Sequence, residues 1–125
     1  MIMIRRLLLI LPAALALTLA PPLRAADSPI ENQLLRISEI LGALHYLRNL
    51  CGEESTEWRD RMNSLLEAEN PDESRRVKFV ASFNSGYRSF EETYATCTSS
   101  AVEAINRYTR DGEALARDTA TRFGN

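Results

Sequence analysis

The sequence predicts an all-α protein, an up-down-up-down four-helix bundle with one disulfide, and three observations support this fold class. Apolar residues recur every three or four positions along four segments, as they do in amphipathic helices. Short connections join the segments, and short connections favour antiparallel neighbours. Cys51 and Cys97 end the first and third segments, and these two ends meet at one pole of such a bundle.

The N-terminal segment, 1–25, has the order of parts of a secretory signal peptide. Two arginines precede an apolar run, 7–19, and small residues follow at Ala25 and Ala26. We expect cleavage after Ala25, because cleavage one residue later would place an arginine in a peptidase pocket for small or aliphatic side chains. The alternative is an uncleaved anchor, but the run is shorter than the ~20 residues that span a bilayer. We therefore predict a periplasmic domain, 26–125, that is not an integral membrane protein.

Charge and length exclude two classes of function. The chain has 125 residues, with 15 basic and 17 acidic side chains. The predicted leader holds three arginines and no acid, so the remaining domain has 12 basic and 17 acidic side chains. An acidic domain of this size is neither a basic nucleic-acid-binding protein nor a multidomain enzyme. We expect no nucleic-acid partner.

The first predicted helix follows Ser28 and ends near Gly52. Ser28 and Glu31 have the spacing of a capping box, and glycine suits a helix C-terminus. The main apolar stripe consists of Ile30, Leu34, Ile37, Leu41, Leu44, Leu47 and Cys51. Three further apolar residues lie opposite this stripe: Leu35, Tyr46 and Leu50. We expect a partner, a second copy or the residues before Ser28 to cover them, because no helix of a four-helix bundle should be fully central.

The other three helices have similar start and stop signals. The second is predicted from Ser55 or Thr56 to Asn70, where a cap-like Asn, Pro, Glu pattern that begins with Asn70 starts the third. The third carries the apolar positions Val77, Val80, Phe83, Tyr87, Phe90, Tyr94 and Cys97. The fourth is predicted to be capped by Ser100, and Gly112 on its stripe predicts close helix packing. Gly86 lies at the edge of the third stripe and is a candidate for a bend.

The two cysteines predict a structural disulfide. An exported chain with two cysteines favours a bond between them, and the bundle topology places Cys51 and Cys97 at the same pole. A redox-active or intermolecular role is the alternative, although a redox pair usually has the adjacent CxxC spacing. We expect the disulfide to stabilise a small core.

No catalytic, metal or cofactor motif is present. His45 is the single histidine, and metal sites usually need several ligands at suitable spacing. A haem held by His45 and Met62 is an alternative that any bundle with one His and one Met permits. We therefore expect no metal and no cofactor, and we do not expect an enzyme. A small cell-wall-active enzyme that uses paired carboxylates stays an alternative.

One polar and aromatic cluster at the disulfide pole is a candidate interaction surface. Its members are His45, Tyr46, Arg48, Trp58, Glu92 and Tyr94. Arg48 lies near the centre of the first apolar stripe, where a cation needs a partner or access to water. Glu91, Glu92 and Glu103 are its candidate partners. The cluster is either an ion pair that fixes helix register or a surface that recognises a partner.

Four stretches carry a family resemblance: 31–52, 58–62, 83–90 and 93–98. They resemble an uncharacterised family of small exported alphaproteobacterial proteins of a two-cysteine helical type, a domain-of-unknown-function family. The resemblance implies a Gram-negative periplasm and carries no activity. Our leading hypothesis is a non-catalytic cell-envelope protein that binds another protein or itself. A small-ligand, metal or haem carrier is the alternative.

Overall fold

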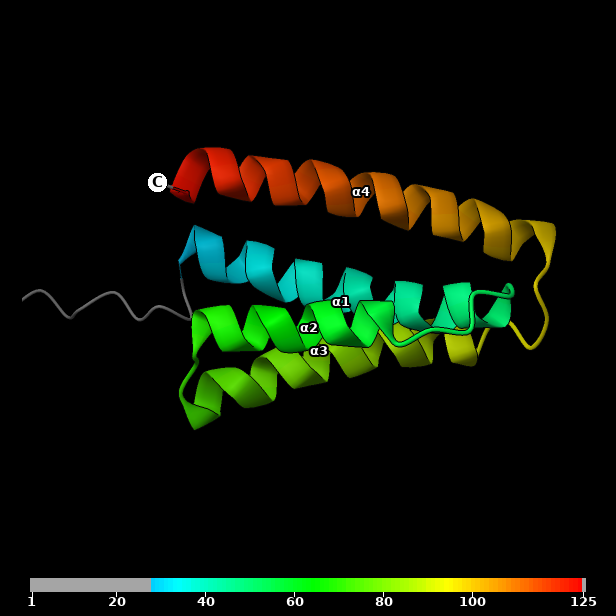
Figure 1. Cartoon of the computed structure of the whole chain (residues 1–125), viewed down its shortest axis with the longest axis horizontal. Helices are drawn as coiled ribbons and strands as arrows, with labels where there is room; N and C mark the ends of the chain where they lie inside the picture. The colour runs from blue at the N-terminus through cyan, green and yellow to red at the C-terminus, as the bar shows by residue number, and fades with distance from the viewer. Residues whose placement is uncertain (1–27, 125) are drawn as a thin grey trace, which may run out of the picture.

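The computed structural model describes residues 28–124, which form four α-helices joined by short connections (Figure 1). The helices are α1 (Pro29–Leu50), α2 (Glu57–Glu69), α3 (Glu73–Glu91) and α4 (Ser99–Phe123). Consecutive helices run in opposite directions, which confirms the predicted all-α up-down-up-down bundle. The predicted leader and its cleavage site at Ala25 and Ala26 lie outside the described residues.

Local signals explain where the helices begin and end. Ser28 caps α1 as predicted, because its hydroxyl accepts a hydrogen bond from the N–H three residues later, at 3.2 Å. Asp72, rather than Asn70, caps α3, and Asn70 instead ends α2 with a left-handed φ of 41°. Thr98 caps α4, two residues before the predicted cap. The number and order of the breaks were therefore predicted correctly, whereas the start of the last break and the capping residues of α3 and α4 were not.

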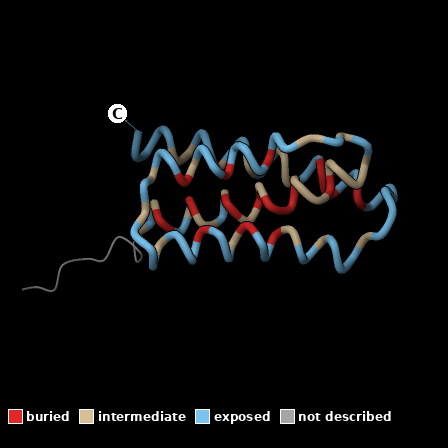
Figure 2. The backbone as a smooth tube through the Cα atoms, turned by 60° about the horizontal axis from the view of Figure 1, so that its bottom comes forward, coloured by how far each residue is buried: buried red, intermediate tan, exposed pale blue. Residues whose placement is uncertain are grey.

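Helix α1 is the central element of the bundle. It packs against α2, α3 and α4, and most extensively against α3. Buried stretches of the backbone lie along the middle of the bundle (Figure 2). Within α1 only Pro29, Asn32 and Arg36 are exposed. The expectation that no helix is central was therefore wrong. Leu35 and Tyr46 pack against the bundle's own core, so their apolar character does not require an outside partner.

The core consists of two clusters along α1. The cluster nearer the disulfide contains Ile40, Leu44, Leu47, Trp58, Ala101, Ala104 and Ile105. The cluster at the other end contains Leu34, Met62, Leu66, Phe79 and Phe83. Each cluster joins α1 to two of the other helices, so α1 holds the bundle together.

Two glycines allow α1 and α3 to pack backbone against backbone. A Cβ atom on Gly42 would lie 1.9 Å from the carbonyl oxygen of Phe83, and one on Gly86 would lie 1.9 Å from that of Glu39. Both glycines are buried, so Gly86 marks a close helix contact and not the edge of a stripe. The predicted close packing at Gly112 is confirmed, because a Cβ there would lie 3.1 Å from Cγ2 of Ile40.

This glycine contact explains an error in the predicted face of α3. Val77 and Val80 are exposed, at 57% and 39%, whereas Phe79 and Phe83 are buried. Gly86 must face α1, and Phe83 and Phe79, three and seven positions before it, share its side of the helix. Helix α3 also ends at Glu91, so the last two positions of the predicted stripe belong to the following loop.

A buried ion pair joins the first turns of α1 and α3. Glu31 is 1% exposed, and its carboxylate accepts hydrogen bonds from Nη2 of Arg75 at 2.7 Å and from Nε at 3.0 Å. These bonds to Glu31 raise the pKa of Arg75. The Glu31 side chain therefore pairs across the bundle, whereas a capping box would turn it back onto its own helix.

We expect Arg75→Ala to lower the free energy of unfolding by about 2 kcal/mol, because it leaves a buried carboxylate without its cation. Urea denaturation followed by circular dichroism measures the change. Arg76→Ala is the matched control, since Arg76 is the exposed neighbour on the same helix. Equal effects of the two substitutions would contradict a specific role for the pair.

Candidate functional site

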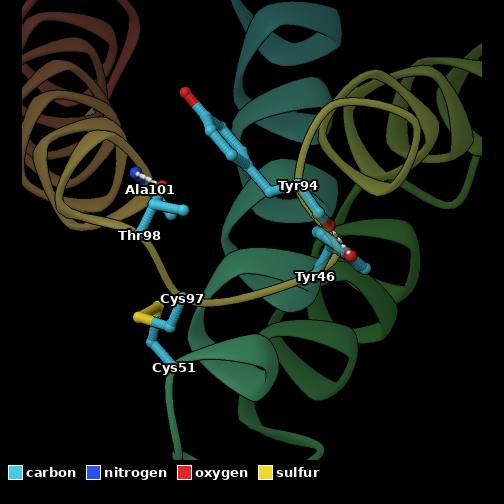
Figure 3. Close-up of a disulfide and its surroundings, with 6 residues drawn as sticks. All are labelled: Tyr46, Cys51, Tyr94, Cys97, Thr98 and Ala101. Atoms are coloured by element: carbon cyan, nitrogen blue, oxygen red, sulfur yellow. Dashed lines mark hydrogen bonds between the residues drawn. A yellow bond between two sulfur atoms is a disulfide. The ribbon is translucent and has the colours of Figure 1, made fainter.

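The disulfide joins the end of α1 to the loop that precedes α4 (Figure 3). The Cα atoms of Cys51 and Cys97 lie 5.0 Å apart, which confirms the predicted pairing. On the same loop, the backbone carbonyl of Tyr94 accepts a hydrogen bond from the Tyr46 hydroxyl. One covalent bond and one hydrogen bond therefore hold this loop against α1.

The structure divides the predicted interaction surface among four places. His45 and Tyr46 line an open hollow of about 450 Å³ beside α1. Trp58 is 7% exposed and belongs to the core, with Arg48 stacked over its ring at 5.2 Å from the centroid. Glu92 lines a separate hollow on the outer side of α3. Tyr94 is half-buried in the loop after α3 and stacks on Phe90, so the six residues do not form one surface.

Arg48 pairs with a residue that the sequence interpretation did not choose. Its Nη1 lies 3.3 Å from Oε2 of Glu53, and its Nη2 donates to the Thr109 hydroxyl at 3.3 Å. Gly52, with a φ of 101°, turns the chain back, so that the N–H of Glu53 reaches the Arg48 carbonyl at 2.9 Å. The turn therefore brings Glu53 to Arg48, and the predicted partners Glu91, Glu92 and Glu103 were wrong.

His45 lies in a partly desolvated aromatic environment. Its ring centroid lies 5.9 Å from that of Phe83 and 5.7 Å from that of Tyr87. Burial lowers the pKa of His45, and the positive charge of Arg59 lowers it further, against an opposing effect of Asp60. The imidazole is therefore harder to protonate in the folded protein than in the unfolded chain.

This shift predicts a loss of stability at acidic pH. The unfolded chain binds a proton at His45 near pH 6.5, whereas the folded protein binds it only at lower pH. The neutral His45 side chain contributes fully to folding stability above pH 6.5, and this contribution declines as the pH falls below 6.5. We expect the urea midpoint to fall less between pH 7.5 and 5.5 in His45→Gln than in the wild type. Identical pH profiles would contradict the prediction.

An apolar groove lies between α2 and α4. Its volume is about 440 Å³, and α1 forms its floor on the side opposite the contact with α3. The floor residues are Ile37, Ile40, Leu41 and Leu44. The walls are formed by Trp58, Arg61, Ser64 and Leu65 of α2 and by Thr109, Gly112, Glu113 and Ala116 of α4. We refer to these twelve residues as the α2–α4 groove.

The groove exists because α2 and α4 both pack on α1 without packing extensively on each other. In Figure 1, α4 and α2 flank α1 along its length. Small residues line the α4 wall at Gly112 and Ala116, and Ser64 lines the α2 wall. Sequence reasoning did not identify the groove, although these small residues beside an apolar stripe were its signal.

The groove has opposite charges at its two walls. Arg61 belongs to the α2 wall, where it pairs with Glu57 at 2.7 Å and lies 4.7 Å from the centroid of the Trp58 ring. Glu113 belongs to the α4 wall. Nε1 of Trp58 and Nε of Arg48 have no hydrogen-bond partner among residues 28–124, but both atoms are buried, and Arg48 does not line the groove. The lining cation near the Trp58 end of the groove is therefore Arg61.

A metal-ligand cluster and a membrane-spanning helix are both absent from the described part of the chain. Residues 28–124 contain no cluster of three or more His, Cys, Asp or Glu side chains that could hold a metal ion. In the same range, no helix combines the length and the apolarity needed to cross a membrane.

Comparisons with known proteins place the chain in a family. No curated protein matches it, and no solved structure matches it. A family model described as a protein of unknown function (DUF2385) matches residues 29–123, which include all four helices and both cysteines. The chain therefore belongs to the DUF2385 family of proteins of unknown function.

Proposed function

We propose that this protein is a non-catalytic domain, exported to the periplasm, which binds an apolar surface of another protein in the α2–α4 groove. The observation that carries this proposal is the groove itself. Its floor is four aliphatic side chains of α1, and no other element among residues 28–124 covers it. Burial of such a surface stabilises a complex by about 25 cal/mol per Å² before the costs of association.

A groove-filling variant tests where the partner binds. Ala116 is exposed on the α4 wall, so Ala116→Phe should fill the groove without disturbing the core. Ala114→Phe adds the same ring on another side of α4. We expect the oxidised wild type and Ala114→Phe to capture the same protein from an envelope extract, and Ala116→Phe to lose it. Equal capture by all three proteins would overturn the proposed site.

Export is tested by the N-terminus of the protein recovered from a Gram-negative host. We expect intact-mass analysis of the periplasmic fraction to give a chain that begins at Ala26. Recovery of the full-length chain in the membrane fraction would instead support the uncleaved anchor. The support for export comes from the order of charged, apolar and small residues in the leader.

The groove volume favours a small-ligand carrier as a second candidate. A hollow of about 440 Å³ lies within the range of roughly 300–1,000 Å³ that is typical of small-molecule sites. Native mass spectrometry of protein purified without detergent would reveal a co-purifying ligand. The enzyme alternative gains no support from this site, because Glu113 is the single carboxylate among the lining residues, whereas glycoside hydrolysis uses two.

A further inference from the structure

We infer that the α2–α4 groove binds one amphipathic helix of its partner, through three apolar side chains on two successive turns. The inference rests on the proposed function and names the chemistry of the partner. Its support comes from the length of the groove, from the charges at its walls and from the position of Arg61 near one end.

The length of the groove matches two helical turns. The floor residues lie at positions i, i+3, i+4 and i+7 of α1, which span about 10 Å along the helix axis. The two walls, 58–65 on α2 and 109–116 on α4, each span the same seven-residue interval. A helix that binds in a groove uses anchors at i, i+3 or i+4, and i+7, which span the same distance.

The cation near the Trp58 end gives the direction of the bound helix. The last four carbonyl groups of a helix have no partner within it, and the partial negative charge of that terminus favours nearby cations. At the Trp58 end the groove offers the guanidinium of Arg61, which lies 4.7 Å from the centroid of the Trp58 ring. We therefore place the C-terminus of the partner helix at Trp58, so that it runs parallel to α1.

The wall charges specify the two edges of the partner helix. Arg61 on the α2 wall fits an acidic edge, and Glu113 on the α4 wall fits a basic edge. Each contact lies at the rim, where an ion pair contributes about 0.2–1 kcal/mol. The apolar anchors therefore supply most of the affinity, and the edges select among amphipathic helices.

Trp58 is the only tryptophan of the chain, so its fluorescence reports directly on the groove. The probe is a 14-residue alanine-based peptide with leucines at its fourth, eighth and eleventh positions. It carries glutamates along one edge and lysines along the other, and a lactam bridge on the opposite face keeps it helical. The matched control peptide has alanine in place of the three leucines.

We expect the leucine peptide to shift the Trp58 emission saturably and the alanine peptide to leave it unchanged. Ala116→Phe should weaken binding at least tenfold, and Ala114→Phe should bind as the wild type does. A nitroxide at the C-terminus of the peptide should quench Trp58 more than one at its N-terminus. The Glu113→Lys variant should bind a peptide with two acidic edges with about threefold higher affinity than the mixed-edge peptide.

Several outcomes would overturn the inference. Unchanged peptide binding by Ala116→Phe would show that the helix does not occupy the groove. Stronger quenching by the N-terminal nitroxide would overturn its direction. If dodecanoate binds saturably below its micellar concentration and the peptide does not bind, the occupant of the groove is a small amphiphile. If the peptide does not bind but capture of an envelope protein still depends on Ala116, the helix inference is wrong and the proposed function is supported. If the peptide does not bind and capture is also independent of Ala116, both are wrong.

Discussion

Replacing both cysteines, by Cys51→Ser with Cys97→Ser, is expected to lower the free energy of unfolding by about 4 kcal/mol. The disulfide closes a loop of 46 positions, and its removal returns the corresponding chain entropy to the unfolded state. A domain of about 100 residues has a total stability of roughly 5–15 kcal/mol, so the loss is a large fraction of it. Urea denaturation of the oxidised wild type and the double variant measures the difference.

The packing around the disulfide suggests a control for this measurement. Tyr46→Phe removes the hydroxyl that donates to the Tyr94 carbonyl but leaves the disulfide in place. We expect Tyr46→Phe to lower the free energy of unfolding by about 1 kcal/mol, the usual net contribution of one hydrogen bond. If the double cysteine variant is as stable as Tyr46→Phe or more stable, the hydrogen bond and side-chain packing stabilise this pole, and the disulfide does not.

Gly86→Ala is expected to destabilise the protein by about 3 kcal/mol or more, because the new methyl group would overlap the backbone of α1. Its Cβ would lie 1.9 Å from the carbonyl oxygen of Glu39 and 3.0 Å from the backbone nitrogen of Ala43. Backbone atoms cannot rotate away as a side chain can, so α1 and α3 must separate. Thermal and urea unfolding both measure this loss.

Gly112→Ala is the matched control, because it also replaces a helical glycine on a packed face. Its Cβ would meet a methyl group of Ile40 at 3.1 Å, which a side chain can relieve by a small movement. Alanine also favours a helix over glycine by about 1 kcal/mol, so we expect a change within about 1 kcal/mol. Similar destabilisation by Gly86→Ala and Gly112→Ala would mean that the α1–α3 contact is no tighter than the others.

Much of the architecture could be predicted from local signals. Periodicity and capping residues depend on a few neighbouring positions, so the four helices and the number and order of the breaks between them were predicted correctly. The pairing of Cys51 with Cys97 followed from helix directions, which short connections largely determine. The cap at Thr98 and the end of α3 at Glu91 were missed, since helix ends depend on contacts that the local sequence does not specify.

The long-range contacts could not be predicted in the same way. Several acidic residues were candidate partners of Arg48, and the turn at Gly52 brings Glu53 into its ion pair. Trp58 was assigned to a candidate interaction surface, and its side chain lies in the core. Glu31 looked like half of a capping box and instead pairs with Arg75 from another helix. Each error concerns which of several competing partners lies nearest in space.

The helices, their order and the disulfide could be predicted from the sequence, because they depend on periodicity and on the ends of elements. Which face of α1 is left uncovered depends on how the helices pack. We predicted that face at Leu35, Tyr46 and Leu50, whereas the glycine contact turns Leu35 and Tyr46 towards the core and Leu50 lines the open hollow beside α1. The opposite side, with Ile37 and Leu41, forms the groove floor, because α2 and α4 pack on α1 and stay apart from each other.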